Sequence, residues 1–182
     1  MTDRAWLVAI DLQRVFGDPS SEWRAPRYAA AQANVVRLAE AFGERSVFTR
    51  FVAPERPSGA WSAYYEQFPW ARAPADSELY ALDAGIAAYA RRTVVAPTFG
   101  KWTAELQALV GERPQLVVAG VATDCCVIST VLAAADAGAP VLVVTDACAG
   151  SSDENHAKAL DIMGLYAPLV SLTTTDEVIG WR

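Results

Sequence analysis

The sequence of 182 residues contains a single histidine, His156. A catalytic zinc ion is usually bound by two or three histidines and a water molecule. A single chain with one histidine cannot form such a site. A Cys–His or Ser–His pair is compatible with the sequence only if it uses His156. The histidine count therefore removes multi-histidine zinc catalysis and leaves one residue for any histidine-assisted nucleophile.

Positive charge and long apolar runs are also scarce. The chain has 15 Lys and Arg against 21 Asp and Glu, which gives a net charge of −6. Binding to nucleic acid or to an anionic membrane depends on Lys and Arg, so we expect neither as a partner. The apolar run at 6–10 is too short for a signal peptide, and no run reaches the length of a transmembrane helix. Three cysteines, an odd number, are typical of free thiols in a reducing compartment, so we expect a cytoplasmic protein.

Short apolar runs alternate with helical patterns along the chain. The apolar runs are typical of strands buried on both faces and lie at 6–10, 46–49, 93–96, 116–119, 141–145 and 169–172. Helical stripes cover 28–42, 102–110, 127–137 and 151–165, the last opening with the capping-box pattern Ser151-x-x-Glu154. This alternation predicts an α/β fold of three layers, αβα, around a six-stranded, mostly parallel, doubly wound, Rossmann-like sheet. We see no linker or repeat, so residues 1–182 are predicted to form one domain.

Three reactive side chains follow the ends of predicted strands: Asp11, Lys101 and Cys126. In an open parallel sheet, ligands bind outside the carboxyl ends of the strands, near the point where the strand order reverses. The three residues are therefore candidates for one site. Each also has a structural interpretation: Asp11 as a turn residue, Lys101 as a solvated cation, and Cys126 as a small buried residue like its neighbour Cys125.

Cys126 lies in a predicted strand-to-helix turn, Gly120 to Val127. A thiol at a helix N-terminus is favoured as thiolate, and the N–H groups there can stabilise an oxyanion. Asp11 could take the thiol proton and later deliver it to a leaving amine. Lys101 could keep Asp11 ionised or stabilise the thiolate.

Four motifs in order along nearly the whole chain resemble those of the isochorismatase-like superfamily, and within it the cysteine hydrolases that include nicotinamidases and N-carbamoylsarcosine amidohydrolases. The motifs are Val8-Ala9-Ile10-Asp11-Leu12-Gln13-x-x-Phe16, Thr98-Phe99-Gly100-Lys101, Gly120-Val121-Ala122-Thr123-Asp124-x-Cys126-Val127, and Asp146-Ala147-Cys148 followed by His156. Each is weak alone, but four at the right separations are specific.

The resemblance implies a role for each candidate. Cys126, rather than Cys125, would be the nucleophile, Asp11 the proton shuttle and Lys101 the cation that positions both. It also implies a cis peptide between Val121 and Ala122, with the Ala122 and Cys126 N–H groups forming the oxyanion hole. The family usually forms dimers or tetramers, so a homodimer or homotetramer is expected.

Two departures from the family narrow the chemistry. Nicotinamidases carry an Asp and several His for a metal after the second strand, whereas the stretch 49–57 here has no histidine. Isochorismatases proper, which cleave a vinyl ether, generally lack the cysteine. We therefore expect a metal-independent cysteine amidohydrolase, with no cofactor, acting on a small-molecule amide or carbamoyl compound. An isochorismatase-type ether hydrolase and a catalytically idle binding protein are the alternatives.

Aromatic residues are expected to line the substrate pocket. The segment 60–70 holds five aromatic residues, in the insertion where this family builds a substrate lid, and two more flank the reactive residues. From these we select Phe16, Trp61 and Trp102 for the pocket. The alternative is that the aromatics pack the lid against the sheet or form a subunit interface. Arg50 and Arg56 could meet a substrate carboxylate or be solvated surface charges.

Four further polar or reactive residues are expected to have structural rather than catalytic roles. Cys148 is expected to be a packing residue, and His156 a structural or capping residue of the helix over 151–165. Asp124 is predicted to cap the helix that follows Cys126, and Asp146 to order a turn.

Overall fold

Six strands form one sheet in the computed structural model, which describes residues 5–112 and 114–181. The strands are β1 (Ala5–Ile10), β2 (Ser46–Phe51), β3 (Thr93–Ala96), β4 (Gln115–Val121), β5 (Val141–Ala149) and β6 (Val170–Thr173). They lie in the order β3-β2-β1-β4-β5-β6, and every neighbouring pair is parallel. The predicted doubly wound α/β sheet is confirmed, and it is parallel throughout rather than mostly. The strand order reverses between β1 and β4.

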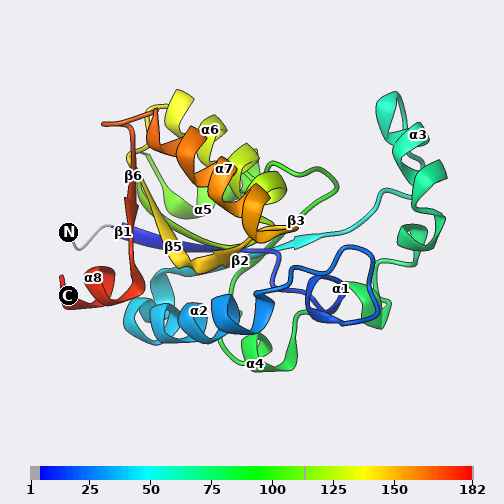
Figure 1. Ribbon diagram of the computed structural model, residues 1–182, viewed down its shortest axis with the longest axis horizontal. Coiled ribbons are helices and arrows are strands. Elements are labelled where there is room, and N and C mark those ends of the chain that lie inside the picture. The colour runs from blue at the N-terminus through cyan, green and yellow to red at the C-terminus, as the bar shows by residue number, and fades with distance from the viewer. Residues whose placement is uncertain (1–4, 113, 182) are drawn as a thin grey trace.

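Helices cover both faces of this sheet (Figure 1). One face carries α2 (Tyr28–Phe42), α4 (Ala84–Ala87) and α8 (Thr175–Gly180), and the other carries α5 (Ala104–Val110), α6 (Ile128–Asp136) and α7 (Asp153–Gly164). Successive side chains of a strand point to opposite faces, so Leu7 and Ala9 enter the first core and Val8 and Ile10 the second. This double burial explains why the strands are continuous apolar runs.

The predicted boundaries hold for α2 and fail for α7. Helix α2 ends before Gly43, which adopts a φ of 55°. Helix α7 begins at Asp153 instead of Ser151, because Ser152 is the cap and its hydroxyl accepts from the Asn155 N–H. The Ser151 hydroxyl instead donates to Asp124. Helix α8 was not predicted, although Thr174 and Glu177 form a capping box at its start.

Strand β5 is four residues longer than the predicted 141–145. It continues past a register shift so that Cys148 pairs with Gly120 and Ala149 with Val121. Asp146 therefore lies within a strand, and the predicted turn there is wrong. Its carboxylate accepts hydrogen bonds from the backbone N–H and hydroxyl of Thr175, which anchors the start of α8.

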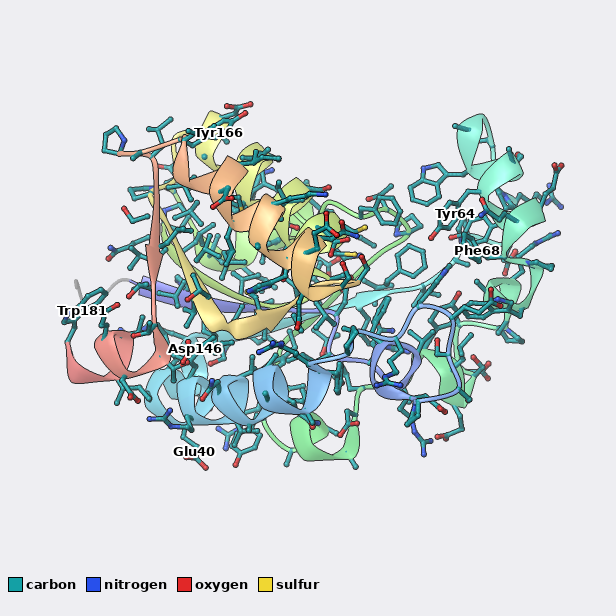
Figure 2. The ribbon with its side chains drawn as sticks, in the orientation of Figure 1. Glu40, Tyr64, Phe68, Asp146, Tyr166 and Trp181 are labelled. Atoms are coloured by element: carbon teal, nitrogen blue, oxygen red, sulfur yellow. The ribbon has the colours of Figure 1, made fainter. Side chains whose placement is uncertain are left out.

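The insertion between β2 and β3 is a chain of short helices. It contains α3 (Ala60–Gln67), η2 (Pro69–Arg72), η3 (Glu78–Tyr80) and α4, while α1 (Arg14–Gly17) and η1 (Gly43–Arg45) lie in other connections. Tyr64 of α3 and Phe68, which follows the helix as its C-cap, lie on the side of that helix nearer the sheet (Figure 2). Buried Tyr80 joins two parts of the insertion through its hydroxyl, which donates to the Ala71 carbonyl.

In the described parts of the chain, every helix is too short or too polar to cross a membrane.

Candidate active site

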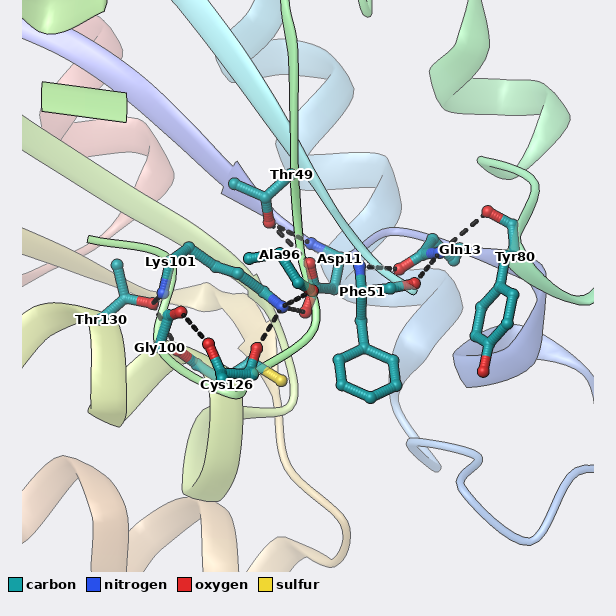
Figure 3. A network of polar contacts seen from close by, with 11 residues as sticks. Asp11, Gln13, Thr49, Phe51, Tyr80, Ala96, Gly100, Lys101, Cys126 and Thr130 are labelled. Atoms are coloured by element: carbon teal, nitrogen blue, oxygen red, sulfur yellow. Dashed lines mark hydrogen bonds and ion pairs between the residues drawn. The ribbon is translucent and has the colours of Figure 1, made fainter. Parts of the chain in front are cut away.

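The three predicted reactive residues meet at the carboxyl edge of the sheet, where the strand order reverses (Figure 3). Asp11 directly follows β1 and has a positive φ of 49°. Lys101 lies in the segment between β3 and α5, and Cys126 lies in η4 (Thr123–Val127), a π-helical turn after β4. The geometry thus follows the rule for open parallel sheets.

Asp11 and Lys101 form an ion pair in which both side chains are completely buried. The Lys101 Nζ lies 3.1 Å from Asp11 Oδ2 and donates to the Thr98 carbonyl at 2.7 Å. The Thr49 hydroxyl donates to Asp11 Oδ1 at 2.6 Å. Buried charges are tolerated only when they are paired and hydrogen-bonded, and these contacts meet that condition. The ring of Phe51 lies 5.0 Å from Nζ and contributes a cation–π contact.

A threonine connects the lysine segment to the cysteine segment. The backbone N–H of Lys101 donates to the Thr130 hydroxyl at 2.9 Å, and that hydroxyl donates to the Cys126 carbonyl at 2.7 Å. The helix predicted over 102–110 begins two residues later, at Ala104 behind the cap Thr103, so Lys101 is separated from it. The lysine is instead held in a loop and buried, which corrects the interpretation as a solvated surface cation.

Strand β4 approaches β1 very closely just before the cysteine turn. Gly120 has a φ of 118°, and a Cβ atom there would lie 2.2 Å from the Ile10 carbonyl oxygen. Only glycine fits a backbone at this separation and φ. The close approach brings η4 next to Asp11. The Val121–Ala122 peptide is cis, as the resemblance implied.

The surroundings of Cys126 favour the protonated form of its thiol. Its exposed fraction is 3%, and burial raises its pKa well above the usual value. The charge of Asp11 and a hydrogen bond with it raise the pKa further, while Lys101 lowers it only in part. The expectation that a helix N-terminus favours the thiolate is therefore wrong here, because burial outweighs it. The thiol must lose its proton during attack, and Asp11 is the neighbouring carboxylate.

A cavity of about 150 Å³ opens onto Cys126. Its wall is mostly aromatic, with two charged side chains and the cysteine turn, and consists of Phe16, Glu22, Trp23, Arg24, Phe51, Tyr64, Phe99, Ala122, Cys125, Cys126 and Ser151. Ala122 and Cys126, the predicted oxyanion-hole residues, both line it. So does Phe16. Trp23 also lines the cavity and was not predicted, because the turn between α1 and α2 carries no periodic signal.

Two of the three aromatics selected for the pocket lie elsewhere. Trp61 packs on Phe99, with ring centroids 5.0 Å apart, and so supports the wall from behind. Trp102 lines a separate hollow with Gln107 and Gly111. The prediction of Trp102 as a pocket residue is therefore not supported by its position.

The arginines proposed to bind a carboxylate also lie away from the cavity wall. Arg50 donates to the carbonyls of Tyr80 and Ala75 and thereby holds the insertion. Arg56 lines an outer hollow with Pro57 and Tyr65. The charged side chains at the cavity are Glu22 and Arg24 instead.

The remaining candidates have structural contacts. Asp124 accepts hydrogen bonds from the N–H and hydroxyl of Ser151 and makes no cap bond, so its predicted capping role is wrong. The His156 ring nitrogen Nδ1 is 2.8 Å from the Thr123 hydroxyl, and burial lowers its pKa. Cys148 is buried in β5. Residues 5–112 and 114–181 contain no group of three or more His, Cys, Asp or Glu arranged to hold a metal ion.

Comparison with known sequences and structures identifies the family. The profile of the isochorismatase domain matches residues 5–177. The chain belongs to the isochorismatase family. A search of curated proteins found no match.

Solved structures share the fold of this isochorismatase-family chain at low identity. A cysteine hydrolase from Pseudomonas syringae pv. phaseolicola 1448A is 17% identical with a TM-score of 0.82, covering 97% of this chain and 91% of its own. An isochorismatase-like hydrolase from Alkaliphilus metalliredigens is 16% identical with a TM-score of 0.79, covering 98% and 99%. PnC1 from L. infantum, in complex with nicotinate, is 19% identical with a TM-score of 0.76, covering 94% and 93%.

Proposed function

We propose that this member of the isochorismatase family is a metal-independent cysteine amidohydrolase, which hydrolyses a C–N bond in a small amide or carbamoyl compound. The observation that carries the proposal is the position of Cys126, which lines a cavity and lies beside a buried Asp11–Lys101 ion pair. A nucleophile next to a group that can accept its proton is the basic requirement of covalent catalysis.

The first half of the reaction forms a thioester. Cys126 Sγ attacks the carbonyl carbon of the substrate while its proton passes to the Asp11 carboxylate. The backbone N–H groups of Ala122 and Cys126, two residues that line the cavity, stabilise the oxyanion. When the C–N bond breaks, Asp11 delivers the proton to the departing ammonia or amine, and an acyl-Cys126 thioester is left.

The second half regenerates the thiol. Asp11, again a carboxylate, accepts a proton from water as that water attacks the thioester carbon. The carboxylic acid leaves, and the proton returns to Cys126 Sγ. Lys101 does not move a proton in this scheme; its ammonium group pairs with the Asp11 carboxylate at 3.1 Å and holds it in position.

Metal independence rests on the sequence, since the stretch 49–57 lacks the histidines that nicotinamidases use. A small planar amide fits the cavity, since about 150 Å³ is enough for one benzene-sized ring. The structural relative PnC1 in complex with nicotinate, a ring of that size, supports the same class of substrate.

The test is ammonia release across a panel of primary amides and carbamoyl compounds. We expect Cys126→Ala to lower kcat by at least about 10³-fold, because the covalent route is lost. Cys125→Ala is the matched control, since its thiol lines the same cavity one residue earlier, and it should keep most of the activity. Activity that survives in Cys126→Ala would overturn the covalent mechanism.

Two other functions are compatible with the same fold, and each has its own test. Pyruvate release from isochorismate by wild type and by Cys126→Ala alike would indicate an ether hydrolase. A Cys126 thiol that stays unreactive with iodoacetamide, together with no turnover of any amide, would indicate a binding protein.

A further inference from the structure

The cavity wall contains one turn that contributes three consecutive residues, Glu22, Trp23 and Arg24. The turn is closed by a hydrogen bond from the Arg24 N–H to the Ser21 carbonyl. Glu22 and Arg24 are exposed, and they are the charged side chains among the residues that line the cavity. The rim of an otherwise aromatic cavity therefore carries two opposite charges.

Neither charge has a partner within residues 5–112 and 114–181. The side chains of Glu22 and Arg24 make no hydrogen bond or ion pair with each other or with any other described residue. By contrast Arg27, three residues further on, is held by Asp153 through two hydrogen bonds of 2.5 and 2.7 Å. A guanidinium and a carboxylate that face a cavity without partners are available to a ligand.

The turn that carries Glu22 and Arg24 is held in place by the residue between them, Trp23. Trp23 contacts five other rings, those of Phe16, Phe51, Tyr64, Phe68 and Trp70, at centroid distances of 4.7–6.2 Å. Fixing Trp23 also fixes the backbone of its two neighbours at the rim. A fixed pair of charges loses less entropy on binding a ligand than a mobile pair does.

We propose that Arg24 and Glu22 form a head-group site, and that the substrate carries a carboxylate and an ammonium side by side at the end remote from its amide, as an α-amino acid does. Arg24 receives the carboxylate and Glu22 the ammonium, while the amide reaches Cys126 through the aromatic part of the cavity. This inference rests on the proposed amidohydrolase function, since it assigns the substrate class of that same site.

Four ligands that differ only in the head group provide the test. They are L-glutamine, 4-carbamoylbutanoate without the ammonium, 4-aminobutanamide without the carboxylate, and butanamide with neither. Their dissociation constants are measured by calorimetric titration of full-length Cys126→Ser, which cannot turn the amides over. We expect each charged group to strengthen binding roughly tenfold, the value of one charge-assisted hydrogen bond.

Single substitutions in the same background assign each charge to its residue. Arg24→Gln should remove the preference for the carboxylate and keep the preference for the ammonium, and Glu22→Gln should do the reverse. Arg56→Gln is the matched control, because Arg56 also makes no side-chain bond with a described residue but lines the outer hollow, and it should change neither preference. Equal affinity for all four ligands, no binding of any, or equal losses for all four in a variant would each overturn the head-group site.

Ammonia release from the same amides by the wild-type protein tests the underlying function separately. Selective binding without ammonia release would refute the amidohydrolase and leave the head-group site in place. Ammonia release from all four amides at equal kcat/KM would overturn the head-group site and support the amidohydrolase.

Discussion

The reactive residues Asp11, Lys101 and Cys126, here called the floor, and the aromatic wall of the cavity are held by different kinds of contact. Cys126 lines the cavity, whereas Asp11 and Lys101 are buried outside its lining. On the floor, Asp11 and Lys101 are completely buried and are fixed by an ion pair and by hydrogen bonds to Thr49 and Thr98. In the wall, Trp23 is fixed by ring contacts, and its buried indole N–H has no hydrogen-bond partner in the described parts of the chain. Hydrogen bonds weaken steeply when their angles change, whereas ring contacts tolerate several orientations.

This difference suits two separate tasks: the floor residues carry out the reaction, and the wall residues select the substrate. The floor comes from the ends of β1 and β4 and from a loop tied to Thr130, so its geometry depends on the sheet itself. Apart from Phe51 at the end of β2, the aromatic wall comes from α1, from the turn before α2, from the insertion and from Phe99, which are connections outside the sheet. Substitutions on the floor should therefore affect both stability and rate, and those in the wall mainly the affinity for substrate.

The largest effect is expected from Lys101→Met. This substitution leaves the Asp11 carboxylate buried without its cation, which should lower the free energy of unfolding by about 3–5 kcal/mol and abolish turnover. Lys158→Met is the matched control, because the Lys158–Glu154 pair is exposed and should change stability by less than about 0.5 kcal/mol. Urea unfolding of both variants provides the measurement. Equal stability of the two would show that the buried pair does not hold the floor.

A second prediction concerns the protonation of Cys126. The Asp11 charge raises the pKa of the thiol and Lys101 lowers it, so Asp11→Asn should lower that pKa. Alkylation by iodoacetamide at pH 8 should become about tenfold faster, while amide hydrolysis is lost with the proton shuttle.

The extent of alkylation is measured by mass spectrometry, with and without Asp11→Asn, in a protein that also carries Cys125→Ser. Only the cysteines Cys126 and Cys148 then remain. Cys148 is the internal reference, because burial raises its pKa to about 12 and keeps it unreactive. Since the wild-type pKa of Cys126 is also raised, its alkylation rate should still be rising above pH 9. Slower alkylation of Cys126 in Asp11→Asn would contradict the assigned role of the carboxylate.

Thr49→Val should have a smaller effect on the floor. It removes the hydroxyl that donates to Asp11 Oδ1 and accepts from the Asp11 N–H. We expect kcat to fall about tenfold and stability to fall by about 1–3 kcal/mol, because a buried acceptor and a buried donor lose their partner. Thr145→Val, which removes a hydroxyl bonded to the Thr173 carbonyl, should leave kcat unchanged. Similar loss of kcat in both variants would indicate a general effect on the sheet.

The same contrast explains which features the sequence could predict. The parallel sheet, and the meeting of Asp11 and Cys126, follow from apolar periodicity and from the rule that strand ends converge where the order reverses. The raised pKa of Cys126 could not be predicted, because it depends on burial and on the distance to Asp11. Thr130 could not be predicted either, since a hydroxyl that joins two segments leaves no pattern in a single sequence.

Which aromatic residues form the wall of the cavity was the hardest feature to predict, and the reason is physical. Trp61 and Trp102 were selected by nearness in sequence to the lid and to Lys101, but side-chain direction in irregular segments follows neither period 2 nor period 3.6. Trp23, in a short turn, contributes more to the cavity than either of them. Aromatic composition predicted the apolar character of the pocket, and three-dimensional packing decided which rings face it.

The smallest predicted effect tests that packing directly. Trp23→Leu removes a ring that lines the cavity, so KM should rise about five- to tenfold while kcat stays within about threefold, because the contact is made equally in the ground and transition states. Trp102→Leu removes a ring of the same kind from the separate hollow and should change neither constant. Steady-state kinetics on any amide that the wild type hydrolyses gives both values. A large fall in kcat for Trp23→Leu would mean that the wall also positions the floor, and the separation of chemistry from specificity would not hold.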